Sequence, residues 1–291
     1  MKIFAIVVTY NRLSLLKECI YSLMKQSHPI DKIIVVNNGS TDGTQEWLEK
    51  QKQYLHIINQ ENIGGAGGFH TGVKYAHSQN ADWMWLMDDD VAPQLDCLEK
   101  LLKFDNHDIG VLQPVRKFQD QYVLFESKKL DLSNPFKYLH QSFIENNEIN
   151  KEPIVIKTIP FEGPLIKKEV VDAIGYPNKD YFIFYDDTDY AHRTTLASKT
   201  IKLIPEAILN KKLLPIEDKE ALSWRKKYEL RNAAYFDRKY GENIQVKFFR
   251  PFIRLYREIS VAKKKTDFTI VKGLLMLKYT IYGILGNLGK L

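Results

Sequence analysis

Apolar segments of two different periods alternate along the first part of the chain, and this alternation constrains the fold more than any other feature. Residues 2–9 and 32–36 are continuous apolar runs rich in β-branched side chains, typical of strands covered on both faces. Between them, residues 13–26 carry leucine and isoleucine at helical spacing. The elements that we expect next are a helix begun by Thr41 or Asp42, a strand near 54–59, a helix near 67–78 and a strand at 82–87.

This order of elements predicts an α/β fold with a doubly wound, mainly parallel sheet and right-handed crossovers. Ligands of such sheets bind beyond the carboxyl ends of the strands. Polar segments of the chain fall at these ends: TYNR at 9–12, NNGSTDG at 37–43 and MDDD at 87–90. We therefore expect a ligand site at one edge of the sheet.

The composition fits a chain that buries a full core. Of the 291 residues, 44% are hydrophobic and 12% aromatic, enough for one large domain or two small ones. The chain holds two cysteines, Cys19 and Cys97, which argues against a disulfide framework and fits a reducing cytoplasm. We interpret Cys19 as a core residue of a helix, and His70 and His192 as ordinary hydrogen-bonded residues rather than metal ligands. The first strand begins at once, so we expect no secretory signal.

The net charge of +6 conceals an uneven distribution. Residues 211–291 hold 19 Lys and Arg against 8 Asp and Glu, whereas residues 1–210 hold 23 against 28. From about residue 216 the pattern is helical, so we expect a catalytic domain over 1–215 and a basic helical region over 216–291. The excess of carboxylates in the first part would repel a phosphate backbone, which argues against nucleic acid as a partner.

Three adjacent aspartates, Asp88, Asp89 and Asp90, follow the apolar segment WMWLM. Like charges repel one another and lose solvation on burial, so something positive must lie beside them. Alternate residues of a strand point the same way, so Asp88 and Asp90 share one face, which suits Mg²⁺ or Mn²⁺. A solvated acidic turn, or a helix that begins at Pro93, is the alternative.

The segment NIGGAGGFHTG at 62–72 carries four glycines within five positions, Gly64, Gly65, Gly67 and Gly68, ahead of an expected helix. Glycines let a backbone approach a ligand closely, and a helix N-terminus attracts anions. The segment lacks the last glycine of a dinucleotide fingerprint and the Gly-Lys of a P-loop. We expect a loop that faces the ligand, with a flexible turn as the alternative.

A second acidic segment, YDDTDYAHR at 185–193, also follows apolar residues. Apolar neighbours and other carboxylates would raise the pKa of Asp187, which suits a general base. The alternative is structural: Asp186, Asp187 or Asp189 caps a helix, and Arg193 pairs with Asp189 one turn earlier.

Segments along most of the chain, over about residues 3–240, resemble the family 2 glycosyltransferases of the GT-A fold in order and spacing. The combination of the glycine-rich segment with three aspartates is most similar to the bacterial galactofuranosyltransferase and rhamnosyltransferase branch, which acts on surface polysaccharides or glycolipids. The matching segments are VVTYNR (7–12), IIVVNNGSTDGT (33–44), GGAGGF (64–69), WLMDDDV (85–91), FEGPLI (161–166), YDDTDYAHR (185–193) and YELRN (228–232).

The resemblance implies roles for the matching residues. Asp88 and Asp90 would coordinate Mn²⁺ or Mg²⁺, and Asp187 would be the catalytic base. The residues that contact or face the nucleotide-sugar donor would be Thr9, Arg12, Asn37, Gly64, Gly65, Gly67, Gly68, Asp88, Asp89, Arg231 and Asn232. Two positions depart from the family pattern: Asn37 replaces an aspartate that contacts the base in many relatives, and Asn210 lies near the place of a metal-binding histidine. The donor's base and the third protein ligand of the metal are therefore left open.

The function implied is an inverting, metal-dependent glycosyltransferase. The best donor is UDP-galactofuranose, and the acceptor is a polysaccharide or a lipid-linked oligosaccharide. The nearest alternative is a rhamnosyltransferase that uses dTDP-rhamnose. A sugar nucleotidyltransferase is an alternative of another class, but its glycine- and lysine-bearing N-terminal loop is not seen in VVTYNRLS at 7–14.

The C-terminal region combines basic and apolar residues. Arg250, Arg254 and Arg257 recur at helical spacing and would form one basic face, followed by three lysines at 263–265. The last segment is apolar, but its lysines and glycines argue against a membrane-spanning helix. We expect helices that attach peripherally to an anionic membrane at its inner, cytoplasmic face. The alternative is a helical cap on the catalytic domain or the interface of a homo-oligomer.

Overall fold

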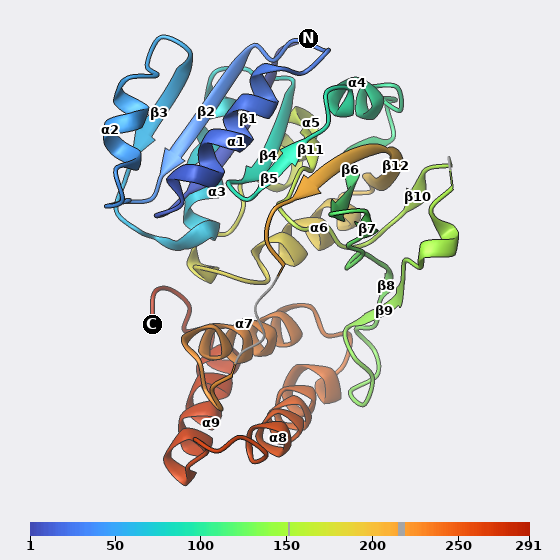
Figure 1. The fold of residues 1–291 in the computed structure, drawn as a ribbon. Coiled ribbons are helices and arrows are strands. Elements are labelled where there is room, and N and C mark those ends of the chain that lie inside the picture. The colour runs from blue at the N-terminus through green and yellow to red at the C-terminus, as the bar shows by residue number, and fades with distance from the viewer. Residues whose placement is uncertain (151, 215–218) are drawn as a thin grey trace.

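The computed structural model describes residues 1–150, 152–214 and 219–291 (Figure 1). The strands are β1 (Ile3–Thr9), β2 (Lys32–Asn37), β3 (Leu55–Asn59), β4 (Trp83–Asp88), β5 (Val91–Pro93), β6 (Ile109–Phe118), β7 (Gln121–Tyr122), β8 (Ser127–Leu130), β9 (His140–Phe143), β10 (Ile154–Val155), β11 (Leu165–Lys167) and β12 (Thr200–Lys211). Ten of them form one sheet in the order β10-β12-β6-β11-β4-β1-β2-β3, with β5 beside β12 and β7 beside β6. β8 and β9 pair separately.

The centre of the large sheet is parallel. β1 lies between β2 and β4, β2 pairs with β3, and all three pairings are parallel, as is that of β6 with β12. β11 is antiparallel to both of its neighbours, β4 and β6. The expected doubly wound, mainly parallel sheet is therefore confirmed, and the weakly patterned segment between residues 105 and 160 supplies strands β6 to β10.

Helices cover both faces of this sheet. Ile3, Ala5 and Val7 of β1 pack into a core shared with α1, α2 and α4, while the alternate residues Phe4 and Ile6 pack into a second core with α3, α5 and α6. The helices are α1 (Leu13–Met24), α2 (Thr44–Glu49), α3 (Gly64–Ser78), α4 (Cys97–Leu102), α5 (Lys168–Ile174), α6 (Asp186–Leu196), α7 (Trp224–Tyr240), α8 (Arg250–Ala262) and α9 (Ile270–Leu285), with short helical turns at Asn146–Glu148, Lys179–Tyr181 and Gln245–Phe249. Cys19 is fully buried in the α1 core, as expected.

The glycine-rich segment departs from expectation, because it forms the first turns of α3 instead of a loop. The reason is close packing: a Cβ added at Gly68 would lie 2.4 Å from Val8 Cγ1 of β1, and one added at Gly67 would lie 2.5 Å from Ile63 Cγ1. A Cβ at Gly65, in contrast, would meet nothing within 4 Å. Gly65 is therefore the glycine that leaves space open beside the helix start.

The second helix also begins later than expected. Gly43, with a φ of 88°, occupies the N-cap position of α2. Asp42 Oδ1 instead accepts hydrogen bonds from the backbone N–H of Thr44 at 3.2 Å and from its hydroxyl at 2.6 Å. Asp42 thus stabilises the first turn from one position further out.

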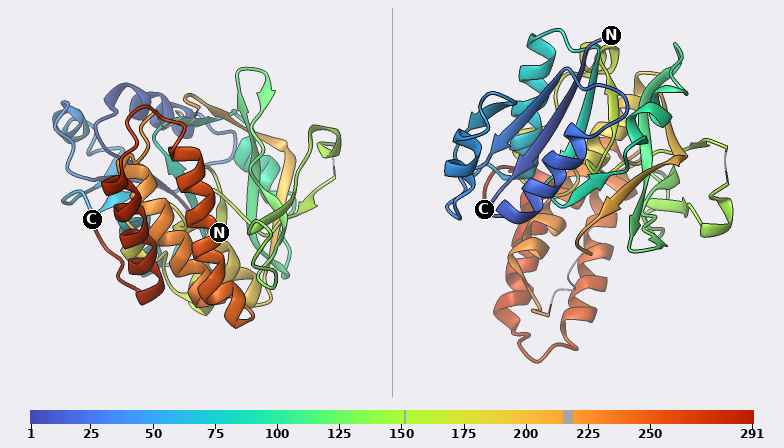
Figure 2. Two further views of the ribbon diagram at one scale, coloured as in Figure 1. Left: turned by 90° about the horizontal axis from the view of Figure 1, so that it is seen from below. Right: turned by 45° about the horizontal axis from the view of Figure 1, so that its top comes forward.

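The C-terminal helices gather beside the edge of the sheet where the parallel strands end (Figures 1 and 2). α9 lies directly against α7, since a Cβ added at Gly283 would fall 2.0 Å from the backbone oxygen of Arg231. The helical region after residue 216 is present as expected, but the predicted boundary between residues 215 and 216 lies outside the described residues. Within the described ranges, no helix has both the length and the apolar character needed to cross a membrane.

The expected basic face of α8 turns inward, which corrects the sequence-based interpretation. Arg250 is 2% exposed, and its Nη1 lies 3.3 Å from Asp237 Oδ1 of α7. Arg254 Nη2 lies 2.9 Å from the other oxygen of Asp237, and Arg257 donates to the backbone oxygen of Phe136 at 2.8 Å. Helical spacing shows that the arginines share a face, but the fully buried Asp237 decides which way that face points.

Candidate active site

Two adjoining cavities lie at the carboxyl ends of β1 and β4. The Arg12 cavity, of about 540 Å³, is lined by residues that include Thr9, Arg12 and Asp89. The Asp187 cavity, of about 430 Å³, is lined by residues that include Glu162 and Asp187. The residues that line both are Gly65, Asp88 and Ile183. The strand ends therefore hold a two-part site whose halves meet at Asp88.

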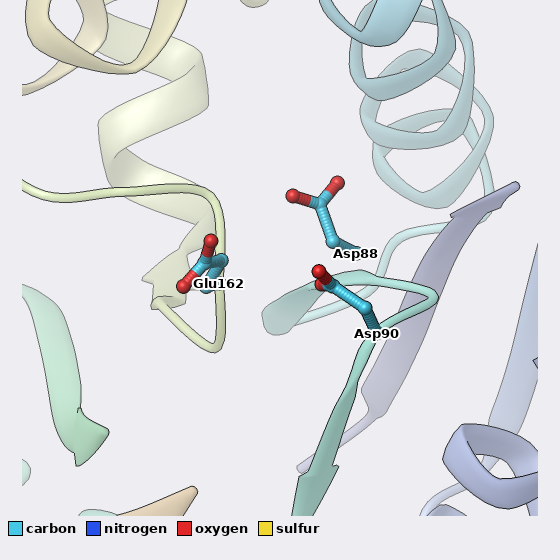
Figure 3. Close-up of side chains that lie close together, drawn as sticks. All are labelled: Asp88, Asp90 and Glu162. Atoms are coloured by element: carbon cyan, nitrogen blue, oxygen red, sulfur yellow. The ribbon is translucent and has the colours of Figure 1, made fainter. Parts of the chain in front are cut away.

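Three carboxylates cluster where the cavities meet. Asp88 ends β4, Asp90 directly precedes β5, and Glu162 lies in the segment that enters β11 (Figure 3). One carboxylate oxygen of each lies within 4.8 Å of those of the other two. The sequence predicts Asp88 and Asp90 as a pair, and the fold adds Glu162.

Cations compensate this cluster unevenly. Lys211 Nζ of β12 lies 2.6 Å from Glu162 Oε1 and 3.6 Å from Asp90 Oδ2, and Arg116 Nη1 donates to Glu162 Oε2 at 2.9 Å. Burial works against ionisation of Glu162, but Arg116 and Lys211 hold its pKa below the usual value. Burial, together with the neighbouring carboxylates, raises the pKa of Asp90 and raises that of Asp88 well above its ordinary value. The cations nearby are therefore not sufficient to stabilise the ionised forms of both Asp88 and Asp90.

The cluster fits a hard divalent cation. Carboxylate oxygens are the ligands that Mn²⁺ and Mg²⁺ prefer. Asp90 Oδ1 is buried and has no hydrogen-bond partner among the described residues, so an oxygen is free to coordinate. Glu162 has both oxygens engaged by Arg116 and Lys211, which leaves Asp88 and Asp90 as the two carboxylates that are free to coordinate a cation.

Asn210 is not a member of this carboxylate group. It precedes Lys211 at the end of β12, where its Cα pairs with those of Ala92 and Lys117. Successive residues of a strand point to opposite faces, and it is the Lys211 side chain that reaches Asp90 and Glu162. Glu162, rather than Asn210, therefore lies beside the two aspartates, with both of its oxygens already engaged by Arg116 and Lys211.

Thr9, Arg12 and Asp89 come together in the Arg12 cavity, as the sequence predicts. Thr9 Oγ1 donates to Asp89 Oδ2 at 2.8 Å, and Arg12 Nη1 donates to Asp89 Oδ1 at 3.1 Å. Arg12 Nη1 also lies 3.7 Å from Asp90 Oδ2. Burial raises the pKa of Asp89, and Arg12 opposes that rise. The end of β1 therefore fixes the orientation of the middle aspartate.

The structure places Asn37 outside the described lining of the Arg12 cavity and Asn38 within it. The Asn37 amide donates to Gln45 Oε1 at 2.8 Å and to Asn59 Oδ1 at 3.2 Å. Asn38 Nδ2 donates to the backbone oxygen of Gly64 at 2.9 Å. Asn37 Oδ1 also accepts a hydrogen bond from the Ser40 backbone N–H at 3.1 Å, so Asn37 stabilises the turn that follows β2, whereas Asn38 lines the cavity.

Asp187 lies in the first turn of α6 and lines the second cavity. Its Oδ1 accepts hydrogen bonds from the Thr188 backbone N–H at 2.6 Å and from the Thr188 hydroxyl at 3.2 Å. Burial is the main cause that raises the pKa of Asp187 to about 6. Such a carboxylate is ionised at neutral pH and accepts a proton readily, as a general base must.

Asp189, two residues further on, has the structural role that the sequence left as an alternative. It is fully buried, and Arg193 Nε donates to its Oδ2 at 2.7 Å, the expected pairing one turn apart. Lys239 Nζ and the Tyr240 hydroxyl of α7 donate to Oδ1 at 3.0 and 2.7 Å. Burial opposes ionisation, but Arg193 and Lys239 keep the pKa of Asp189 below its usual value.

Arg231 and Asn232 are fully buried in α7 and support the segment that leads into α6. Arg231 Nη2 and Asn232 Nδ2 each donate to the backbone oxygen of Tyr181 at 3.0 Å, and Asn232 Nδ2 also donates to Ile183 and Phe184. Phe182 and Phe184 have φ values of 67° and 65°, a conformation that costs energy in residues other than glycine. Arg231 and Asn232 therefore hold a strained segment in place. Neither of these two residues belongs to the described lining of either cavity.

Several residues of the site are not predicted by the sequence reasoning. Glu162 lies in FEGPLI, a segment that resembles the family pattern and so could have indicated it. Arg116 and Lys211 come from strands whose pairing no local pattern reveals. His140 of β9 also lines the Asp187 cavity, and burial lowers its pKa to about 4, so it is neutral at pH 7. His70, interpreted as an ordinary residue, contacts the backbone oxygen of Pro177 at 2.8 Å.

Comparisons with known proteins agree with this geometry. The family model described as glycosyl transferase family 2 matches residues 4–175. The galactofuranosyltransferase GlfT1 of Mycolicibacterium smegmatis is 28% identical over 195 residues, which cover 65% of this chain and 64% of that protein. The dTDP-rhamnosyl transferase RfbF of Shigella flexneri is 24% identical over 206 residues, which cover 70% of this chain and 67% of that protein. The chain thus spans slightly less than two thirds of the length of GlfT1.

A solved structure shows the same architecture. The mannosyltransferase PcManGT of Pyrobaculum calidifontis, in complex with GDP-Man and Mn²⁺, matches with a TM-score of 0.61 and 13% identity over 98% of this chain and 87% of that chain. At this identity the likeness establishes the fold, and the expected GT-A architecture is confirmed. With a family model that spans more than half of its length, this chain belongs to glycosyl transferase family 2.

Proposed function

We propose that the protein is an inverting glycosyltransferase that moves galactofuranose from UDP-galactofuranose to a hydroxyl of a polysaccharide or lipid-linked glycan. The observation that carries this proposal is the meeting of two cavities at Asp88. The Arg12 cavity would take the nucleotide of the donor, and the Asp187 cavity would take the acceptor. The sugar to be transferred would lie between them.

Asp187 is the proposed catalytic base. As an acceptor oxygen attacks the anomeric carbon, the bond from that carbon to the phosphate oxygen breaks, and the hydroxyl proton passes to an Asp187 carboxylate oxygen. The leaving group departs on the opposite side, so a single displacement inverts the anomeric centre. Arg231 and Asn232 contribute to this step indirectly, because they fix the backbone that leads to Asp187.

Asp88 and Asp90, with Glu162 beside them, would hold Mn²⁺ or Mg²⁺. A cation bound there would supply a Lewis acid that stabilises the negative charge on the departing nucleoside diphosphate. Lys211 already neutralises part of the cluster, and its ammonium group lies on the side of Glu162. We therefore expect the protein to bind the metal chiefly through the two aspartates.

Galactofuranose is the proposed sugar because GlfT1, a galactofuranosyltransferase, is 28% identical to this chain over 195 residues. The second candidate is rhamnose from dTDP-rhamnose, because RfbF, a dTDP-rhamnosyl transferase, matches 70% of the chain at 24% identity. The two candidates differ in the nucleotide released, so one assay separates them.

The test is nucleotide release by the purified full chain with Mn²⁺ and crude lipid-linked acceptor. The donors compared are UDP-galactofuranose, UDP-galactopyranose, UDP-glucose and dTDP-rhamnose. We expect UDP release from the furanose donor alone, and a chelator should abolish it. Release of dTDP would assign the rhamnose reaction instead. Absence of turnover with every donor, together with pyrophosphate release from a nucleoside triphosphate and sugar phosphate, would reject the transferase.

We also propose that α9 lies at the inner face of the cell membrane. Ile270, Leu274 and Leu285 are 80%, 61% and 67% exposed and, with Ile281, form one apolar stripe along the helix. Two exposed lysines, at 263 and 264, precede this helix and would meet anionic lipid headgroups. The inward-facing arginines of α8 have no part in this proposal.

Sedimentation with vesicles tests the membrane proposal. We expect the protein to bind vesicles that contain phosphatidylserine more strongly than neutral phosphatidylcholine vesicles. Leu274→Glu should weaken this binding, whereas Leu196→Glu, at a similarly exposed residue of α6, should not. Equal absence from both vesicle types, with a dimer in light scattering that Leu274→Glu dissociates, would assign the stripe to a subunit interface instead.

A further inference from the structure

The segment that follows α9 returns from the helical region toward the sheet. α9 ends at Leu285, and Gly286 has a φ of 80°, a left-handed conformation that reverses the chain direction. The close approach of α9 to α7 at Gly283 brings this reversal next to α7. Residues 286–291, here named the strap, then run between α7 and the sheet (Figure 1).

Hydrogen bonds to backbone groups of the strap hold it in place. The Gly289 N–H donates to the backbone oxygen of Asp180 at 2.7 Å, and Arg231 Nη1 donates to the Gly289 oxygen at 2.5 Å. The Leu291 N–H donates to the Tyr228 hydroxyl at 2.8 Å. The strap is therefore fixed both to α7 and to the segment before Asp187, and its next side chain, Lys290, has a defined position.

Lys290 lines the Arg12 cavity. Three residues of α7, Trp224, Arg225 and Tyr228, line the same cavity. Lys290 Nζ lies 3.4 Å from the backbone oxygen of Asn62 and 5.9 Å above the ring of Phe182, and both of these residues also line the cavity. Among the described residues, Lys290 forms no ion pair with a carboxylate, so its charge remains free to bind an anion.

The charges that line the cavity determine which kind of ligand Lys290 would contact. Asp88 and Asp89 lie on the sheet side, where Arg12 is engaged with Asp89. An anionic ligand beside these aspartates needs further cations, and Lys290 and Arg225 supply them from the helical side. A nucleoside diphosphate has this requirement, because its two phosphates carry the charge and its base does not.

We propose that Lys290 is a binding residue for the phosphates of the donor, so that the C-terminal helical region completes the donor site. This inference rests on the proposed function. It assigns the strap a role in donor binding that is independent of membrane attachment, since the strap after α9 places Lys290 at the cavity while the apolar stripe of α9 faces away from α7.

Calorimetric titration of the full chain with UDP and with uridine, both in the presence of Mn²⁺, tests the inference. We expect Lys290→Gln to weaken UDP binding by about tenfold and to leave uridine binding unchanged, because uridine has no phosphate. Lys290→Arg should retain most of the UDP affinity. Lys50→Gln, at an exposed lysine that lines neither cavity, is the matched control and should bind both as the wild type does.

The other outcomes overturn distinct claims. If Lys290→Gln binds UDP as tightly as the wild type, the phosphate contact is wrong while the proposed function stands. If UDP and uridine affinities fall by the same factor, Lys290 acts by shaping the cavity, and the inference is rejected. If the wild-type protein binds none of UDP, dTDP and GDP, the proposed function fails, and the role of Lys290 fails with it.

Discussion

The acidic segments at 88–90 and 186–189 have similar composition, but the fold surrounds Asp88 and Asp90 with other carboxylates and Asp189 with cations. Asp88 and Asp90 are crowded by other carboxylates, with Lys211 as the nearest described cation to Asp90 at 3.6 Å. Asp189, in contrast, has Arg193 and Lys239 within 3.0 Å. Asp88 and Asp90 of the first segment have no cation within 3.5 Å among the described residues, whereas Asp189 of the second segment is already neutralised.

The chemistry of each aspartate depends on which elements supply its charged partners. Arg193 lies on the same helix as Asp189, so their pairing follows from sequence spacing. Asp187 lies between these extremes: it has hydrogen bonds from Thr188, and burial raises its pKa to about 6. One carboxylate is thus suited to stability, one to proton transfer and two to metal binding.

The largest expected effect comes from Asp90→Asn. Loss of this ligand should reduce Mn²⁺-dependent turnover by about 10³-fold, because it removes stabilisation of the leaving group. Titration calorimetry should show weaker Mn²⁺ binding. The melting temperature should not fall, because burial and neighbouring carboxylates already disfavour the ionised Asp90. Full turnover with unchanged Mn²⁺ affinity would remove Asp90 from the metal site.

Asp189→Asn should lower the stability of the protein, which Asp90→Asn should not. It leaves Arg193 and Lys239 without their carboxylate in a buried position, and the free energy of unfolding should fall by about 3 kcal/mol at pH 7. The pKa of Asp189 is lowered in the folded protein, so its stabilisation is present above the unfolded pKa of about 4 and is lost below it. Urea unfolding at pH 7 and at pH 3.5 should therefore show a difference that shrinks in acid.

An exposed carboxylate provides the control for that experiment. Asp108, whose side chain is 71% exposed beside His107, should lose less than about 0.5 kcal/mol on replacement by asparagine. If Asp189→Asn lowers the free energy of unfolding by no more than Asp108→Asn does, the buried pairing has no structural role, and the two acidic segments do not differ in the way described.

The pH dependence of turnover should show the smallest effect. With a pKa of about 6, Asp187 is ionised at pH 7 and protonated in acid, so kcat/KM should be constant above pH 7 and fall about tenfold per unit below pH 6. UDP binding measured over the same range separates loss of the base from loss of the donor. A kcat/KM that stays constant down to pH 5 would contradict a base with a raised pKa.

Much of the sheet and half of the site follow from local sequence patterns. The apolar runs of β1 and β2 and the helical stripe of α1 are visible in the sequence because both faces of the sheet are covered. Thr9, Arg12 and Asp89 could be placed together because adjacent parallel strands end at one edge. These inferences needed only periodicity and the rules of sheet topology.

The rest of the site depends on contacts that no local pattern encodes. Lys211 and Arg116 reach Glu162 only because β12 pairs with β6 and β11 lies between β6 and β4. Arg250 and Arg254 share a helical face, but that face is buried because Asp237 of α7 lies opposite. A glycine-rich composition predicts a ligand loop at the start of α3, but close packing of a helix against β1 requires the same small residues.

We infer that the two acidic segments have separate roles, with the donor bound at 88–90 and the proton accepted at Asp187. The most direct test compares Asp187→Asn with the wild type in two measurements, UDP affinity in Mn²⁺ and turnover of the donor found in the release assay. We predict unchanged UDP affinity and a fall in kcat of about 10³-fold. Retention of most of the turnover with intact donor binding would contradict the account.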